Sequence, residues 1–157
     1  MAVGDLLLNP ANTDLVQYLQ LLAAHRLSLV DYFVDGSMAR PAVLNPVPSV
    51  LTQKVASGGY PLMNYDSLAT ATWTLRSDVS SSTVVVLTST TTMAYSGTLT
   101  VDFKNWGFDT VETVSVSTVA TEGLRIRLCE IHGPVAELSI EVPGLDVLVL
   151  EFAPAVM

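Results

Sequence analysis

From residue 68 to the end of the chain, apolar and polar side chains alternate over short segments, as in β-strands with one buried face. Thr, Val and Ser fill many of these positions and suit a pleated, half-buried surface. Turn formers such as Gly, Pro, Asn and Asp separate the segments. Seven strands are predicted in this way, over residues 68–76, 83–88, 98–104, 112–118, 124–130, 135–142 and 145–152. Seven short strands with no helical pattern between them predict an antiparallel β-sandwich.

The alternation also predicts which side chains enter the core of the sandwich. In the third of these strands, the apolar side chains of Leu99 and Val101 are expected to face inward. In the fifth strand we expect the apolar side chains to face inward and the arginines outward. The inward set is Leu124, Ile126 and Leu128, and the outward set is Arg125 and Arg127.

One long helix is predicted before the sandwich, over residues 12–34. Asn12 and Asp14 offer cap oxygens where it begins, and Gly36 is placed to end it. Further apolar positions beside its main apolar stripe widen the surface, so we expect other protein to cover more than one side of the helix. The stripe at helical spacing, and the predicted interface, consists of Leu15, Tyr18, Leu19, Leu22, Leu29 and Phe33.

The 157 residues are predicted to form one structural domain. Residues 1–66 supply the helix and a connecting segment rich in Pro and Gly, which contains a short edge strand over 50–55. This part is expected to pack on the sandwich formed by residues 67–157. The predicted fold class is therefore mainly β, an antiparallel sandwich of about 7–8 strands preceded by one long N-terminal α-helix.

The charge balance excludes two classes of partner. Fifteen acidic residues stand against seven Lys and Arg, which gives a net charge of −8. Nucleic acid and anionic membrane surfaces would be repelled, and the sequence has no basic cluster to offset this. The sequence also lacks an apolar run of about 18 residues and the pattern of a signal peptide, so we expect a soluble chain of undetermined compartment.

Three segments follow one another in a suggestive order. A helix with an Arg in its second half runs through a Gly toward a Pro (LVQYLQLLAAHRLSLVDYFVDGSMARP, residues 15–41). A strand, a polar turn and a strand come next (LATATWTLRSDVSSSTVVVLTSTTT, residues 68–92), and a hairpin closes the chain (ELSIEVPGLDVLVLEFAP, residues 137–154). This order resembles the end of a glycoside hydrolase, where the last helix of a catalytic (β/α)8 barrel leads into a C-terminal antiparallel β-sandwich.

The resemblance implies a non-catalytic accessory domain. The catalytic carboxylates of such enzymes lie on barrel strands, and this sequence contains none of those strands, so no catalytic residue carries over. The expected role is packing between domains or subunits, in a homo-oligomer or with a separate catalytic-barrel chain that binds the N-terminal helix. Whether Met1 is the natural start stays open. The mass of the endogenous protein in native extract would separate a free-standing domain from the tail of an enzyme.

The residues alone show no complete catalytic or metal-binding site, and we expect no cofactor and no metal. Glu137 and Glu141 lie on the polar side of one predicted strand, which indicates a solvated face rather than the paired acids of a glycosidase. Glu130 and His132 point the same way, but His25 is the only other histidine and a zinc site needs three or four ligands. The single cysteine, residue 129, forms no internal disulfide and is expected to be a buried or half-buried thiol.

Aromatic residues are the remaining candidates for binding, because sugar-binding modules stack rings against flat aromatic faces. Trp73 alternates with Ala71 and Leu75 and is expected in the core. Trp106 and Phe108 lie in a predicted turn and are the candidate carbohydrate contacts. The other interpretation of Trp106 is a ring that folds back to cap the sandwich.

Three further functions stay open beside the accessory domain. A stand-alone carbohydrate-binding module would present exposed rings, and a small enzyme would bring together acids that the sequence does not pair. A surface or virion structural protein is the third, because sandwiches rich in Thr, Ser and Val are common there. Glycan binding, a cleft with converging carboxylates and particle assembly, respectively, would distinguish them.

Overall fold

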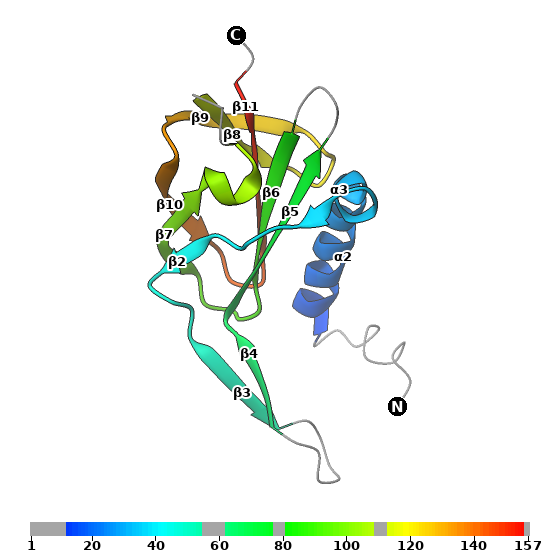
Figure 1. The fold of residues 1–157 in the computed structure, drawn as a ribbon. Coiled ribbons are helices and arrows are strands. Elements are labelled where there is room, and N and C mark those ends of the chain that lie inside the picture. The colour runs from blue at the N-terminus through cyan, green and yellow to red at the C-terminus, as the bar shows by residue number, and fades with distance from the viewer. Residues whose placement is uncertain (1–11, 55–61, 77–80, 109–112, 156–157) are drawn as a thin grey trace.

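Two antiparallel sheets lie face to face in the computed structural model, and helices cover the outer face of the larger sheet (Figure 1). The structure describes residues 12–54, 62–76, 81–108 and 113–155. The helices are α2 (Thr13–Ser28) and α3 (Val30–Val34). The predicted fold class, a β-sandwich with an N-terminal helix, is confirmed.

The strands form three groups. The larger sheet has six, in the order β1 (Ser37–Met38), β5 (Leu68–Arg76), β6 (Ser81–Ser89), β11 (Val147–Pro154), β8 (Thr113–Val119) and β9 (Arg125–His132). The smaller sheet has three, in the order β10 (Val135–Val142), β7 (Tyr95–Asp102) and β2 (Val43–Asn45). A hairpin of β3 (Val50–Lys54) and β4 (Leu62–Asp66) projects from the sandwich (Figure 1).

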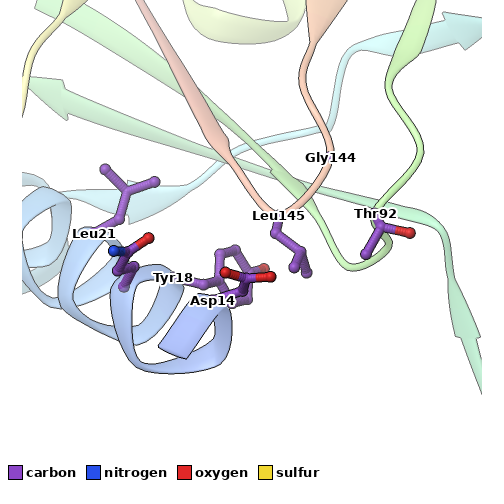
Figure 2. A pocket seen from close by; sticks show the side chains of 7 residues that line it. Asp14, Tyr18, Leu21, Thr92, Gly144 and Leu145 are labelled. Atoms are coloured by element: carbon purple, nitrogen blue, oxygen red, sulfur yellow. The ribbon is translucent and has the colours of Figure 1, made fainter. Parts of the chain in front are cut away.

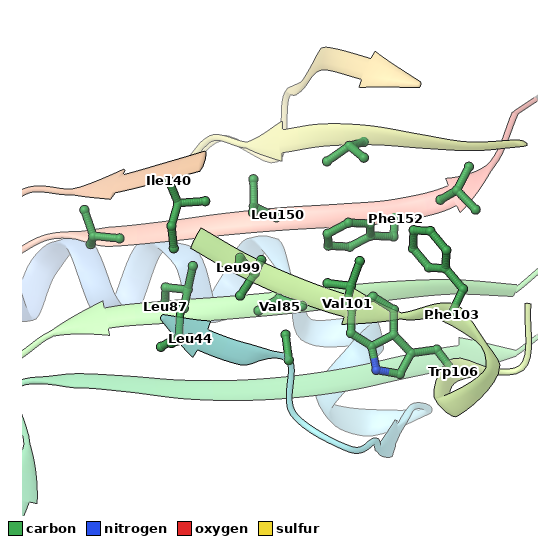
Figure 3. Close-up of a cluster of buried hydrophobic side chains, with 14 of the residues drawn as sticks. Leu44, Val85, Leu87, Leu99, Val101, Phe103, Trp106, Ile140, Leu150 and Phe152 are labelled. Carbon is green, nitrogen blue, oxygen red and sulfur yellow. The ribbon is translucent and has the colours of Figure 1, made fainter. Parts of the chain in front are cut away.

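The main core fills the space between the two sheets (Figure 3). Leu87 of β6, Leu99 of β7 and Phe152 of β11 are all fully buried there. A short 3-10 helix, η2 (Phe103–Trp106), follows β7 and turns its rings back into the core. The ring centres of Trp106 and Phe152 lie 5.1 Å apart at a tilted angle, a favourable arrangement for two aromatic side chains.

The two central strands of the larger sheet are buried on both faces. On β6, Val85 and Leu87 point into the main core, whereas Val84 and Val86 point toward the helices. The neighbouring strand β11 divides its side chains in the same way. Because both faces are covered, each strand contains a run of consecutive apolar residues, 84–87 in β6 and 147–150 in β11, rather than apolar residues at alternate positions.

The predicted single helix over 12–34 is two helices. α2 ends at Ser28, and the buried Leu29 separates it from α3. The Ser28 hydroxyl donates to the backbone oxygen of His25 at 2.9 Å, a local bond of the kind that competes with the helix ladder. The interruption places Leu29 and Tyr32 together against the sheet.

All seven predicted strands are present, with β5 and β10 at the predicted bounds and the others within three residues of them. The edge strand expected over 50–55 is β3, although residue 55 lies outside the described residues. The sequence did not predict β1, β2 or β4. β1 and β2 have only two and three residues, too few for an alternation to register, and prolines surround β2.

The expected burial of the apolar side chains in and beside β9 is wrong. Leu124, Ile126 and Leu128 are 63%, 53% and 56% exposed. Ile126 pairs with Thr118, which lies on the same face of β8 as the buried Val116, so its side chain does point to the inner face. It nevertheless stays 53% exposed, on the strand that forms the edge of the six-stranded sheet.

A β-bulge adds to the difference at Leu128. Val116 pairs with Cys129 and Ser117 pairs with Arg127, so Leu128 is an extra residue with no partner on β8. A period of two cannot continue through such a bulge, and no residue pattern in this segment predicts the bulge.

These positions provide a matched test of where the core lies. Leu99→Ala removes a fully buried side chain and should lower the free energy of unfolding by about 2–5 kcal/mol. Leu128→Ala makes the same chemical change at an exposed position and should alter it by less than about 0.5 kcal/mol. Urea unfolding followed by tryptophan fluorescence measures both. Similar losses in the two variants would contradict the assignment.

Candidate functional site at the helix–sheet interface

The candidate site lies where the helices pack on the outer face of the larger sheet, because this region combines pockets with buried polar side chains. The buried side of α2 and α3 presents Leu22, Leu29 and Tyr32 to residues of β5, β6 and β11. Two pockets open along the boundary between the helices and the sheet, and buried polar side chains lie within this second apolar layer. Both sides of the layer come from segments that the sequence places far apart.

The first opening, here the turn pocket, lies beside the start of α2 (Figure 2). It has a volume of about 530 Å³. Its lining residues come from α2, from the turn between β6 and β7, and from the turn between β10 and β11; they are Asp14, Gln17, Tyr18, Leu21, Thr92, Gly144 and Leu145.

The two turns at this pocket lock together through their backbones. A Cβ on Gly144 would lie 2.1 Å from the backbone oxygen of Thr92, so no larger residue fits there. Leu145 donates its backbone N–H to the Thr91 oxygen at 2.6 Å. Of the non-glycine residues that the structure describes, only Leu145 has a positive φ, 52°. The surrounding contacts hold a residue in a conformation that it rarely adopts.

The turn pocket offers hydrogen bonds and one negative charge. Asp14 supplies a carboxylate, Gln17 a carboxamide, Tyr18 a phenol and Thr92 a hydroxyl. Burial raises the pKa of Tyr18, so this phenol stays neutral near pH 7 and can donate. A single carboxylate does not provide the paired acid and base that glycoside hydrolysis requires.

The second opening, here the helix–sheet cleft, is apolar. It has a volume of about 470 Å³. Leu22, His25, Arg26, Leu29, Phe33, Trp73, Val86 and Val147 line it. The rings of Phe33 and Trp73 meet edge to face, with their centres 4.7 Å apart.

His25 is the buried polar group of this cleft. It is 7% exposed, and its Nδ1 atom has no hydrogen-bond partner. Burial lowers the pKa of His25, and the nearby carboxylates of Asp146 and Glu122 oppose that shift without reversing it. The imidazole is therefore neutral at pH 7 and carries one N–H and one lone pair.

A buried carboxylate connects α3 to the larger sheet. Glu151 of β11 is 8% exposed and accepts a hydrogen bond from the Tyr32 hydroxyl at 2.6 Å. Its other oxygen accepts from Nε of Arg125 on β9. Because a phenol has one proton, Ser82, whose hydroxyl lies 2.6 Å away, donates to the Tyr32 oxygen. The cluster thus pairs its buried charge and links α3, β6, β11 and β9.

The helices also carry apolar side chains that remain exposed. We name this set the outer stripe; it consists of Leu15, Leu19, Ala23, Leu27, Val30 and Val34. Its members are spaced three or four residues apart, so they lie along one side of α2 and α3. Leu27 and Val34 are 76% and 72% exposed. The outer stripe therefore adjoins, but differs from, the side that packs on the sheet.

The predicted interface residues divide between these two sides. Leu15 and Leu19 belong to the outer stripe. Leu29 is buried, and the rest of the predicted set, Tyr18, Leu22 and Phe33, packs partly buried against the sheet. One continuous stripe in the sequence thus serves partly as the inner layer and partly as free surface.

The exposure proposed for Trp106 and Phe108 is not found. The two side chains are 1% and 3% exposed within the main core. The Trp106 indole N–H donates to the backbone oxygen of Arg40 at 2.9 Å. Neither ring presents a face on which a sugar could stack, and the alternative interpretation of Trp106 as a cap on the sandwich fits its position. Trp73, expected in the core, is half-buried against the helices.

The candidate acid and metal pairs are not assembled. Glu130 is paired with Arg127, and His132 Nδ1 lies 3.0 Å from the Thr113 hydroxyl. Glu137 and Glu141 are exposed on β10, and four residues of strand separate them by roughly 13 Å, beyond the range for paired catalytic acids. Among the described residues, no three His, Cys, Asp or Glu side chains lie close enough together to hold a metal ion.

The buried polar residues of this region were not predicted from the sequence. Glu151 is a lone carboxylate inside the apolar run VLVLEF, and this position was the available signal, since a charge in such a strand needs a buried partner. Its partners lie 26 and 119 residues away along the chain. No spacing rule connects residues at such separations.

Comparison with known proteins adds little. No protein-family model matches the sequence, and no curated protein matches it. Among solved structures, a GH27 β-L-arabinopyranosidase from Geobacillus stearothermophilus, in complex with arabinose, aligns with a TM-score of 0.38 and 15% sequence identity. The alignment covers 55% of this chain and 18% of that one. A similarity of this size carries no conclusion about family, activity or substrate.

The length and apolarity of the helices were also compared with what a membrane-spanning helix requires. Within the described ranges, none of them combines the length and apolarity required to cross a membrane.

The polar cluster should stabilise the helix–sheet interface. Tyr32→Phe removes one donor from the buried Glu151 carboxylate and should lower the free energy of unfolding by about 1–3 kcal/mol in urea titrations. Tyr65→Phe is the matched control, because Tyr65 is 36% exposed, and its effect should stay under about 0.5 kcal/mol. Equal effects would argue against the role of the cluster.

The same tyrosine should make stability depend on alkaline pH. Burial, and then the bond to Glu151, raise the pKa of Tyr32 in the folded protein above its ordinary value of about 10. The folded state therefore holds the phenolic proton more tightly, so this stability is complete below pH of about 10 and is lost as the pH rises above it. Unfolding free energies measured across this range should fall more steeply for the wild type than for Tyr32→Phe. Parallel curves would contradict the prediction.

Proposed function

We propose that this chain is a non-catalytic accessory β-sandwich domain of the glycoside hydrolase type, whose function is packing between protein subunits. The observation that carries the proposal is the outer stripe on α2 and α3. Leu27 and Val34, each more than two-thirds exposed, are its most exposed members. An amphipathic helix normally buries its apolar side chains, and exposed apolar patches mark interaction surfaces.

The partner that we propose is a second copy of this chain. Because the protein has a net charge of −8, two copies repel one another over most of their surface. The outer stripe itself contains no acidic residue, and the charged residues beside it include Arg26 and Asp31, which have opposite signs. A stripe of uncharged side chains along a helix is self-complementary, so the same patch serves on both subunits of a two-fold dimer.

The openings at the helix–sheet interface support a non-catalytic role. Of the described residues that line them, only Asp14 carries a carboxylate. The buried Glu151 is already bonded to Tyr32 and Arg125, so its oxygens are engaged in holding the fold. A stand-alone carbohydrate-binding module based on Trp106 and Phe108 loses its support, because both rings are buried.

The test is the mass of the purified chain in solution. Light scattering at rising concentration should give a mass twice the 16.8 kDa of one chain. Leu27→Glu puts a charge in the middle of the outer stripe and should return the protein to a monomer, since burying an unpaired charge is costly.

Met93→Glu provides the matched control. Met93 lies outside the outer stripe, in the turn between β6 and β7, and is 78% exposed, against 76% for Leu27. This variant should remain a dimer. A wild-type protein that stays monomeric at every concentration would refute the proposal, as would a Leu27→Glu variant that still dimerises.

A further inference from the structure

We propose that the contact between α2 and the larger sheet is an acid-sensitive switch, in which protonation of His25 releases α2 and uncovers the outer face of the sheet. The switch rests on a buried imidazole at the helix–sheet contact and on the interruption between α2 and α3. It concerns the inner side of α2, so it does not depend on the subunit packing proposed for the outer stripe.

His25 is buried where its charged form is poorly accommodated. The residue is more than nine-tenths buried, and its Nδ1 atom has no hydrogen-bond partner. The strands that line the cleft with it contribute only uncharged side chains there, Trp73 of β5, Val86 of β6 and Val147 of β11. A protonated imidazole carries a hydrogen on both ring nitrogens, so Nδ1 would become a buried donor without an acceptor. Charging His25 in its packed position is therefore costly.

The charged groups around His25 reduce this cost without removing it. Asp146 precedes β11, Glu122 lies in the turn between β8 and β9, and both favour the protonated imidazole. Glu122 is exposed, and an oxygen of Asp146 already accepts from the backbone N–H of Val147 at 2.7 Å. Arg26 also lines the cleft, but it is exposed, so water screens its charge. Burial remains the largest influence and holds the pKa of His25 below its ordinary value of about 6.5.

The interruption between α2 and α3 allows α2 to leave while α3 stays (Figure 1). A hydrogen bond from Tyr32 to Glu151 ties α3 to the larger sheet, and Glu151 is in turn paired with Arg125. The inner side of α2 packs through apolar side chains such as Leu22, and apolar contacts have no fixed direction. Release of α2 is thus the smallest rearrangement that brings the imidazole of His25 into water.

Acid favours the released state of α2. In that state His25 lies in water and titrates near its ordinary pKa, whereas burial lowers the pKa in the packed state. The released state therefore binds the proton more readily, so the packing of α2 is complete above a pH of about 7 and weakens as the pH falls below about 6.5. Between the two pKa values, each pH unit shifts the equilibrium about tenfold toward release.

The experiment measures hydrogen exchange of the backbone amides of the full chain at about pH 7.5 and about pH 5.5, corrected for the intrinsic exchange rate at each pH. Protection of the α2 amides should fall about tenfold over this range. Protection of the β7 amides should change by less than about twofold, because β7 belongs to the smaller sheet, on the other side of the main core. The indole N–H of Trp73 should lose protection together with α2, and that of Trp106 should not.

The chain offers a matched control because it contains two histidines. His25→Leu places an apolar side chain that cannot be protonated, so protection of α2 should agree within about twofold at the two pH values. His132→Gln removes the other histidine, which is exposed on β9, and should keep the tenfold fall. Leu27→Glu, expected above to prevent dimer formation, should also keep it, so failure of the subunit-packing proposal would leave this result unchanged.

Three outcomes would overturn the inference: unchanged α2 protection in the wild type at the lower pH, the same fall in His25→Leu, and a fall that disappears in His132→Gln. Should His25→Leu fail to fold, the imidazole of His25 in the wild-type protein still decides. Its carbon–proton signal should titrate with a midpoint below the ordinary value of about 6.5, and a midpoint at or above that value contradicts the switch.

Discussion

The structure depends on the covering of the outer face of the six-stranded sheet. β6 and β11 present apolar side chains to both of their faces, so a two-layer sandwich would leave one apolar face in water. The helices α2 and α3 remove that face from solvent and make the fold three layers deep, with the main core on one side and Val84, Val149 and Leu29 on the other. The N-terminal helical segment is thus part of the packed structure, since the central strands require its presence.

The polar cluster gives that apolar contact a defined geometry. Apolar surfaces attract without direction, whereas Glu151 fixes Tyr32 and Arg125 at set positions through hydrogen bonds. The three residues come from a helix, a central strand and an edge strand. A buried charge of this kind contributes less to total stability than to the choice of one helix position, because misplacing α3 would leave the carboxylate without donors.

The positions of the strands could be predicted from the sequence, but the burial of several side chains could not. Alternation located β5 and β10 at their bounds, because each residue of a strand carries its own signal of burial. Burial itself depends on what lies opposite, and no local pattern shows that Ile126 lies exposed on an edge strand or that a bulge isolates Leu128. The expected exposure of Trp106 is wrong for a related reason. The sequence predicts a turn there, but Trp106 belongs to η2, which directs its ring back into the core. The cleft around His25 is formed by three segments that are far apart in the sequence, and no local spacing pattern predicts that they come together.

The bulge in β9 has a consequence for how the protein behaves among its own copies. β9 forms one border of the six-stranded sheet, and a border strand exposes backbone groups that could recruit another strand. The extra residue Leu128 disrupts the regular row of those groups, and the charges of Arg127 and Glu130 flank it. The sheet therefore ends in an edge that does not template further growth, so apolar side chains can remain on this border without inviting fibrous assembly. Association between copies through the β9 edge is thereby disfavoured.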